Sequence, residues 1–181
     1  MTARRAVFVD RDGVINANME RDGRPVAPTT LEDFRLLPGV EDAVRRLRDA
    51  GLVVIVVTNQ PDIATGRTTR ATVEAMHALI RARLPVDDIR MCPHVDADHC
   101  ACRKPKPGMI LAAASERGID LAASYVVGDR WRDIAAGRAA GCLTILVDNG
   151  YEPDRSHPPD AVVRSLTEAV DYIMGKRHEG D

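Results

Sequence analysis

The sequence is poor in aromatic residues and has no excess of positive charge. Of its 181 residues, 3% are aromatic (two phenylalanines, three tyrosines and one tryptophan), and the formal net charge is −2. Nucleic-acid binding through stacking and phosphate contacts needs a basic track lined with aromatic rings, which this composition does not supply. The charge balance also gives no reason to expect attraction to an anionic membrane. We therefore expect neither a nucleic acid nor a membrane as partner.

Long apolar runs and a secretory leader are also lacking. No apolar stretch approaches the ~20 residues that span a bilayer. The chain passes from Arg4 and Arg5 directly into a short apolar segment that ends at Asp10. A secretory signal needs a longer apolar segment followed by a cleavage site. We therefore expect a cytoplasmic protein, and we expect it to be a monomer.

Aliphatic residues, in contrast, are plentiful. Hydrophobic residues make up 45% of the chain, and most are Val, Ile, Leu or Ala, which suits helices packed on a parallel sheet. With 181 residues the chain can bury one substantial core. Expected strands alternate with expected helices, and this predicts a single α/β domain over 1–181, a three-layer α/β/α sandwich with a mainly parallel sheet. Strands are expected at 6–10, 52–57, 89–92, 124–127, 143–147 and 161–164, and helices at 40–50, 70–83, 107–117, 131–140 and 166–175.

Three of the expected strands end in polar residues suited to chemistry. Because the carboxyl ends of parallel strands lie along one edge of a sheet, these residues should converge on one crevice. Two carboxylates two residues apart resist joint ionisation unless a cation lies between them. Any one of these strand ends alone could be a polar turn, but three together favour phosphoryl transfer to a carboxylate, aided by an acid or base and a divalent ion. The residues are Asp10 and Asp12, then Thr58, Asn59 and Gln60, then Asp129 and Asp133.

Cysteines and a histidine cluster in the polar segment 92–102. Three thiolates and one imidazole form a closed tetrahedral set, the structural kind of zinc site. The alternatives are cysteines packed as small hydrophobes, although the segment lacks a hydrophobic period, and a disulfide, which a reducing cytoplasm disfavours. His99 is a competing ligand, and Cys142 is expected to be inert core. We predict a structural Zn²⁺ bound by Cys92, His94, Cys100 and Cys102.

Four motifs in order resemble those of the haloacid dehalogenase (HAD) superfamily phosphatases. They are Asp10-x-Asp12-Gly13-Val14, Thr58-Asn59-Gln60, Arg103-Lys104-Pro105 and Gly128-Asp129-x-x-x-Asp133. Within the superfamily, the segments 10–16, 92–94 and 100–109 are similar to those of the heptose bisphosphate phosphatases. The histidinol-phosphate phosphatases share most of them. The heptose enzymes carry a zinc loop at this place with Cys-x-His and Cys-x-Cys pairs, a pattern that excludes His99.

The resemblance implies a role for each residue of the first two motifs. Asp10 is the expected nucleophile, and Asp12 the expected acid that protonates the leaving sugar oxygen and then the base that activates water. Mg²⁺ is expected on Asp10, the backbone carbonyl of Asp12 and Asp129. Thr58 and the amide of Asn59 are expected to bind the phosphoryl oxygens.

The remaining motifs are expected to supply cations and substrate contacts. Lys104 should neutralise the transferring phosphoryl group, and Asp133 should orient Lys104 or a metal-bound water. Arg103, Arg130 and Gln60 are expected to bind substrate. The plainer alternatives are a solvated basic run for 103–106 and a surface helix residue for Arg130.

The expected activity is therefore Mg²⁺-dependent hydrolysis of a small phosphorylated sugar, D-glycero-D-manno-heptose 1,7-bisphosphate, at its 7-phosphate. Histidinol phosphate or another small phosphomonoester is the first alternative. A non-catalytic phosphate sensor and a nucleic-acid 3′-phosphatase are more distant ones. The intervals between motifs are too short for a large cap domain, so the enzyme should be capless, with at most a small flap from loop 11–37. Pro61 and Asp62 depart from the Ser-Gly usual in the heptose enzymes, which bears on substrate choice.

Overall fold

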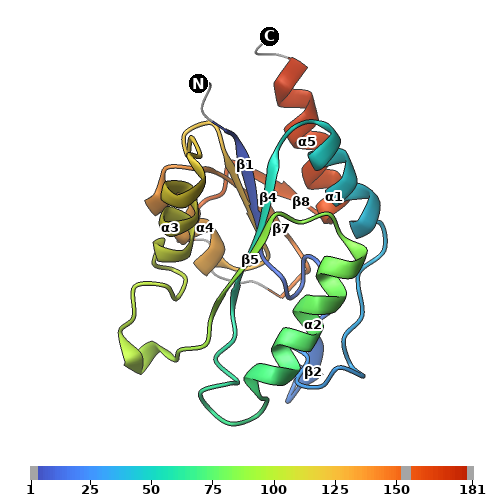
Figure 1. Ribbon diagram of the computed structural model, residues 1–181, viewed down its shortest axis with the longest axis vertical. Helices are drawn as coiled ribbons and strands as arrows, with labels where there is room; N and C mark the ends of the chain where they lie inside the picture. The colour runs from blue at the N-terminus through green and yellow to red at the C-terminus, as the bar shows by residue number, and fades with distance from the viewer. Residues whose placement is uncertain (1–3, 152–155, 179–181) are drawn as a thin grey trace.

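Residues 4–151 and 156–178 are described by the computed structural model. Six parallel strands form the central sheet in the order β5-β4-β1-β6-β7-β8, and helices cover both of its faces (Figure 1). The predicted three-layer α/β/α architecture is confirmed. The strands are β1 (Ala6–Val9), β4 (Val53–Asn59), β5 (Asp88–Cys92), β6 (Tyr125–Gly128), β7 (Leu143–Val147) and β8 (Ala161–Val163). The helices are α1 (Val40–Asp49), α2 (Arg70–Arg83), α3 (Gly108–Arg117), α4 (Trp131–Ala140) and α5 (Leu166–His178).

Two hydrophobic cores lie on opposite faces of the sheet because successive strand residues point to opposite sides. In β1, Val7 and Val9 pack with α1, α2 and α5, whereas Ala6 and Phe8 pack with α3 and α4. Residues 53–58 of β4 are likewise buried. Strands buried on both faces explain the uninterrupted apolar runs in the sequence.

The chain order reverses at β1, which pairs in parallel with β4 on one side and with β6 on the other. Ligands of open α/β sheets bind at such a reversal, outside the carboxyl ends of the strands. This edge of the sheet is the lower end of the molecule in Figure 1. The topology therefore places the ends of β1, β4 and β6 around one crevice.

The segment 11–37, predicted to be a loop, contains a small β-hairpin. Its strands, β2 (Met19–Arg21) and β3 (Arg24–Val26), pair antiparallel, with Arg21 opposite Arg24. The two turn residues, Asp22 and Gly23, have φ angles of 53° and 70°, as a tight Asp-Gly hairpin turn requires. The strands were missed because they are only three residues long and lack an apolar alternation. The hairpin is a small flap beside the crevice.

The remaining differences concern the ends of elements: β4 continues to Asn59, two residues beyond its expected end at 57. Helix α5 extends to His178, beyond the expected end at 175. The crossing expected at 152–160 lies partly outside the described residues, at 152–155. Among the helices that the structure describes, none combines the length and apolar character needed to cross a bilayer.

Candidate active site

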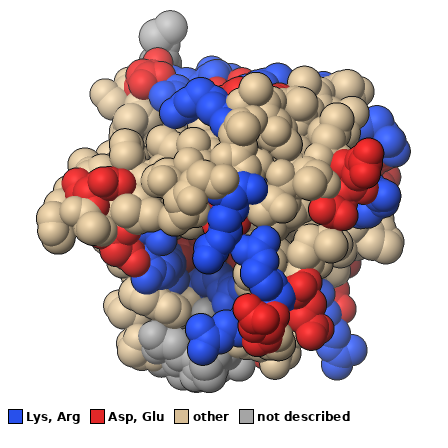
Figure 2. All heavy atoms as spheres, turned by 90° about the horizontal axis from the view of Figure 1, so that it is seen from below, with Lys and Arg blue, Asp and Glu red and all other residues tan. Residues whose placement is uncertain are grey.

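A cavity of about 340 Å³ opens at the carboxyl ends of β1, β4 and β6. Figure 2 views this end of the molecule and shows basic side chains gathered around a hollow. The predicted residues that line the cavity are Asp10, Asp12, Asn59, Gln60, Arg103, Lys104, Asp129, Arg130 and Asp133. Thr58, also predicted for this site, is not among the lining residues and is fully buried. The lining also includes Asn18, Pro25, Val26, Ala27, Pro61, Asp62, Trp131 and Arg132, most of which the sequence motifs did not single out.

Lys104 lies at the centre of the site and is almost completely buried. Its Nζ donates to Asp10 Oδ1 at 2.8 Å, to Asp133 Oδ1 at 2.6 Å and to the carbonyl of Val57 at 2.8 Å. Burial alone would lower the pKa of Lys104, but the two carboxylates outweigh it and raise that pKa above its ordinary value. Lys104 is therefore a fixed cation beside Asp10, and Asp133 helps to hold it there.

Three buried carboxylates, those of Asp10, Asp129 and Asp133, have oxygens within 4.8 Å of one another. Burial and the nearby Asp133 raise the pKa of Asp10 well above its ordinary value, and the same two causes raise the pKa of Asp129 to about 6. If all three carboxylates are ionised, this cluster, Lys104 included, carries a net charge of about −2. Such a surplus of oxygen ligands and negative charge fits a hard divalent cation such as Mg²⁺.

Gly13 allows this cluster to form against the turn after β1. Its φ is 83°, and a Cβ there would lie only 2.0 Å from Asp129 Oδ2. The same carboxylate accepts a hydrogen bond from the hydroxyl of Tyr151 and lies 3.4 Å from Asn18 Nδ2. Any larger residue at 13 would collide with Asp129, so the glycine of the first motif is a steric requirement.

The carboxyl group of Asp12 is held apart from the three-carboxylate cluster by a network of its own. Its Oδ1 accepts from Arg11 Nε at 3.1 Å, Arg11 Nη2 at 2.9 Å and Asn16 Nδ2 at 3.0 Å. Its Oδ2 accepts from Gln60 Nε2 at 2.7 Å, and Gln60 also contacts Thr58 Oγ1 at 2.9 Å. Gln60, predicted to bind substrate, thus makes its described side-chain contacts to two predicted catalytic residues.

Asn59 ties β4 to the loop that carries Lys104. Its Oδ1 accepts from the backbone N–H of Lys104 at 3.1 Å, and its Nδ2 donates to the Lys104 carbonyl at 3.0 Å. Both polar atoms of the Asn59 side chain are therefore engaged by the protein. Asn59 would therefore contact a phosphoryl group through its backbone N–H and not through its side chain.

Arginines form one wall of the cavity. Arg103 Nε and Arg132 Nη1 both donate to Asp96 Oδ1, at 2.8 and 2.9 Å. Asp96 begins the short 3-10 helix η1 (Asp96–Asp98) of the cysteine-rich loop. The guanidinium of Arg130 lies over the ring of Tyr151, 4.5 Å from its centroid. Arg132 was missed because nothing in the sequence separates it from an exposed helix residue.

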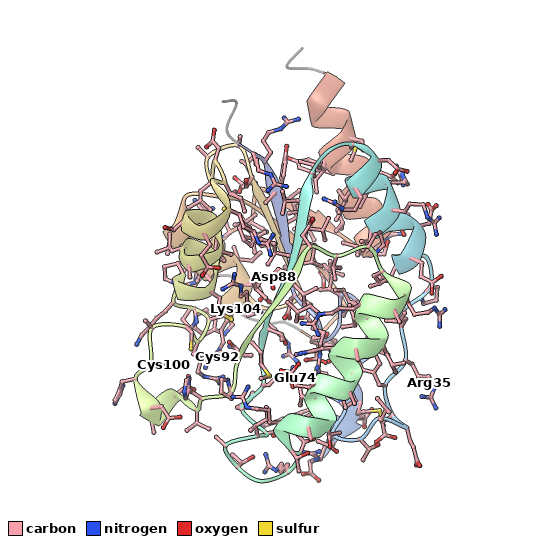
Figure 3. All side chains as sticks on the ribbon, in the orientation of Figure 1. Arg35, Glu74, Asp88, Cys92, Cys100 and Lys104 are labelled. Carbon is pink, nitrogen blue, oxygen red and sulfur yellow. The ribbon has the colours of Figure 1, made fainter. Side chains whose placement is uncertain are left out.

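The cysteine-rich loop brings its four predicted ligands together, and Figure 3 labels two of them, Cys92 and Cys100. Cys92 Sγ lies 3.0 Å from Cys102 Sγ and 3.6 Å from Cys100 Sγ, and His94 Nδ1 lies 3.3 Å from Cys102 Sγ. These separations are too long for a disulfide, whose sulfurs lie about 2.05 Å apart. They approach the edges of a tetrahedron with metal–sulfur bonds of about 2.3 Å. His99 is not part of the group.

His77 on α2 provides a prediction on stability. Burial and then the Arg11 guanidinium lower the pKa of this imidazole from 6.5 to about 4. As the pH falls from about 7 towards 4, the His77 imidazole binds a proton in the unfolded chain before it does so in the folded protein, so the folded state loses stability. Between about pH 7 and 5 the unfolding free energy should therefore fall more steeply for wild type than for His77→Gln. Urea titrations at several pH values measure both slopes, and equal slopes would contradict the assignment.

Comparison with known proteins supports the class that the geometry suggests. Residues 101–169 match the model of the HAD-hydrolase-like family. A heptose 1,7-bisphosphate phosphatase from B. bronchiseptica, solved with magnesium and phosphate, superposes with a TM-score of 0.79 and 34% identity, covering 95% of this chain and 99% of that one. The fold and the site thus define a HAD-type phosphatase, a phosphoric monoester hydrolase.

Sequence relatives identify the family within this class. D-glycero-β-D-manno-heptose-1,7-bisphosphate 7-phosphatases from Pseudomonas putida and Escherichia coli K12 are 42% and 36% identical to this chain, over 80% and 93% of its length and 82% and 93% of theirs. The chain belongs to the family of these heptose bisphosphate phosphatases.

Proposed function

We propose that the protein hydrolyses D-glycero-D-manno-heptose 1,7-bisphosphate at the 7-phosphate, through an aspartyl-phosphate on Asp10. The observation that carries the proposal is the Lys104 ammonium, held between Asp10 and Asp133 and beside Asp129 at the floor of the cavity. A phosphoryl group spreads negative charge over its oxygens during transfer, so a fixed cation next to a carboxylate nucleophile suits that reaction. The family relationship supports the substrate.

The chemistry needs two steps, in which Asp10 and Asp12 exchange roles. In the first step, an oxygen of Asp10 bonds to phosphorus as the bond between phosphorus and the sugar oxygen breaks. Asp12 gives its proton to the leaving sugar oxygen. In the second, water attacks phosphorus and passes a proton to Asp12, while the bond to Asp10 breaks. Inorganic phosphate leaves, and both aspartates return to their initial states.

Three groups around Asp10 stabilise the phosphoryl oxygens in this proposal. Lys104 neutralises their charge, and the Thr58 hydroxyl and the backbone amide of Asn59 donate hydrogen bonds. The Asn59 side chain keeps the Lys104 backbone in place. Preorganised donors of this kind act at low cost because they need no reorientation during the reaction.

Mg²⁺ fits the carboxylates at the floor of the cavity. Asp10, the backbone carbonyl of Asp12 and Asp129 would hold the ion, and Asp133 would remain with Lys104. The pKa values of Asp10 and Asp129 are raised because these carboxylates are buried and close to other negative charges. A bound cation would reduce the repulsion between them. When bound, the ion supplies charge neutralisation and Lewis acidity at the phosphoryl group.

The arginine wall suits a substrate with a second anionic group. Arg103, Arg130 and Arg132 line the cavity in addition to Lys104. Guanidinium groups bind phosphates through paired hydrogen bonds. The volume of about 340 Å³ lies at the small end of ligand sites, as a phosphorylated sugar requires.

A structural Zn²⁺ in the loop 92–102 completes the proposal. Three cysteines and His94 would fill all four positions, which leaves none for substrate, so the ion would act as a structural clamp. Cys102 directly precedes Arg103 and Lys104, and fixing it would fix two cations of the site. The close thiols, unbridged by disulfides, suit a reducing compartment, and on this ground we also propose a cytoplasmic location. We further propose a monomer built as a single domain around the six-stranded sheet.

A phosphate-release assay with Mg²⁺ tests the substrate. The heptose bisphosphate should be hydrolysed with a kcat/KM about 100-fold above that of p-nitrophenyl phosphate or histidinol phosphate, because its remote phosphate contributes binding energy in the transition state. Mass spectrometry of the product should show loss of the 7-phosphate. A preference for histidinol phosphate would contradict the substrate, and no turnover of any monoester would indicate a phosphate-sensing protein.

A further inference from the structure

A fully buried cation lies directly behind the proposed acid/base group. Arg11 has no exposed surface, and its guanidinium lies 5.7 Å from the centroid of the Phe34 ring. In the part of the chain that the structure describes, the ion pair of Arg11 is with Asp12, at 2.9 Å. A buried charge is costly unless it is paired and hydrogen-bonded, so the orientation of the Asp12 carboxyl is tied to a rigid part of the core.

The far side of this guanidinium is held by α2. Arg11 Nη1 lies 3.3 Å from Nε2 of His77, which is 1% exposed. Arginine can only donate, so Nε2 is the acceptor and the neutral ring carries its proton on Nδ1. That nitrogen lies 3.6 Å from a carboxylate oxygen of Glu74, which favours the same tautomer. The helix thus supplies an oriented acceptor that fixes the plane of the guanidinium.

The two oxygens of Asp12 consequently differ. Oδ1 already accepts from three N–H groups of Arg11 and Asn16, whereas Oδ2 accepts from Gln60 alone. A saturated oxygen has little capacity left for a proton. Oδ2 is therefore the oxygen free to carry the proton, and its partner Gln60 lines the cavity and also contacts Thr58 at the end of β4.

We propose that Arg11 and His77 are positioning residues that fix the carboxyl plane of Asp12 and direct its Oδ2 to the leaving-group oxygen. The inference rests on the proposed function, in which Asp12 transfers the proton. Neither residue lines the cavity, so each acts through Asp12 and not on the substrate. Loss of the alignment should slow proton transfer while leaving substrate binding intact.

Substrates with different leaving groups separate this role from a structural one. A sugar or alkyl alcohol needs a proton to leave, whereas p-nitrophenolate leaves without one. Arg11→Met should lower kcat/KM for an alkyl phosphate by about 100-fold, the scale of general acid catalysis, and for p-nitrophenyl phosphate by less than about fivefold. Arg11→Lys should recover part of the loss. Arg45→Met, the same change at an exposed position on α1, is the matched control and should behave as wild type.

The His77 variants provide an independent test if Arg11→Met does not fold. His77→Leu removes the acceptor and should lose about tenfold more on the alkyl ester than on the nitrophenyl ester, whereas His77→Gln restores an acceptor and should lose less. Equal losses on both esters, or none, would overturn the inference. Failure of wild type to hydrolyse any monoester would instead overturn the proposed function.

Discussion

Asp10→Asn should abolish phosphate release, by about four orders of magnitude or more, while the protein remains folded. An amide is a poor nucleophile, and in the proposed mechanism the attacking carboxylate is that of Asp10. Lys104 keeps its contacts with Asp133 and the Val57 carbonyl in this variant, so its charge stays paired. Initial rates with and without Mg²⁺ measure the loss.

The same substitution should not destabilise the protein. In wild type, Asp10 is buried beside Asp133 and Asp129, and burial together with these like charges raises its pKa well above the usual value. Replacing one carboxylate with a neutral amide relieves repulsion that a bound cation would otherwise relieve. The melting temperature of Asp10→Asn in metal-free buffer should therefore equal or exceed that of wild type, while its rise on addition of Mg²⁺ should be smaller.

Asp49→Asn, the same change at an exposed position on α1, controls for the loss of a carboxylate and should retain full activity. Residual turnover by Asp10→Asn above about 1% of wild type would be incompatible with a covalent intermediate on this residue. Normal activity with a lowered melting temperature would show that the cluster serves folding and not catalysis.

The sequence predicts the backbone of this protein well because the dominant signals are strong and local. Continuous β-branched runs such as Val53–Val57 arise only where a strand is covered on both faces, and helical spacing of Val40, Ala43, Val44 and Leu47 matches the buried side of α1. Once the strands are parallel, their carboxyl ends must share an edge. Convergence of Asp10, Thr58 and Asp129 therefore follows from topology.

Contacts between side chains could not be predicted in the same way. Motif position indicates that Gln60 lies near the site, but only its rotamer shows that Nε2 contacts Asp12 instead of open cavity. The pairing of Arg11 with His77 joins residues 66 positions apart, and each alone resembles an ordinary charged or core residue. The hairpin at 19–26 closes through a two-residue Asp-Gly turn, a sequence signal too short to outweigh its exposed, charged strands.

His94→Ala should lose the proposed zinc, whereas His99→Ala should keep it. His94 Nδ1 lies 3.3 Å from Cys102 Sγ within the ligand group, while His99 is exposed and outside it. Elemental analysis after metal-replete expression should find about one zinc per chain in wild type and His99→Ala, and less than about a tenth of that in His94→Ala. Equal zinc in both variants, or none in wild type, would refute the site.

Loss of this metal should also lower the activity, because the zinc loop is continuous with the segment that carries the catalytic lysine. Cys102 is joined directly to Arg103 and Lys104, and Asp96 of the same loop holds Arg103 and Arg132. A displacement of these cations by about 1 Å is enough to cost roughly 100-fold in kcat/KM, and we expect a loss of that order in His94→Ala. Because Asn59 anchors Lys104 separately, the loss should remain well below that of Asp10→Asn. Unchanged activity in a zinc-free variant would show that the loop folds correctly without its metal.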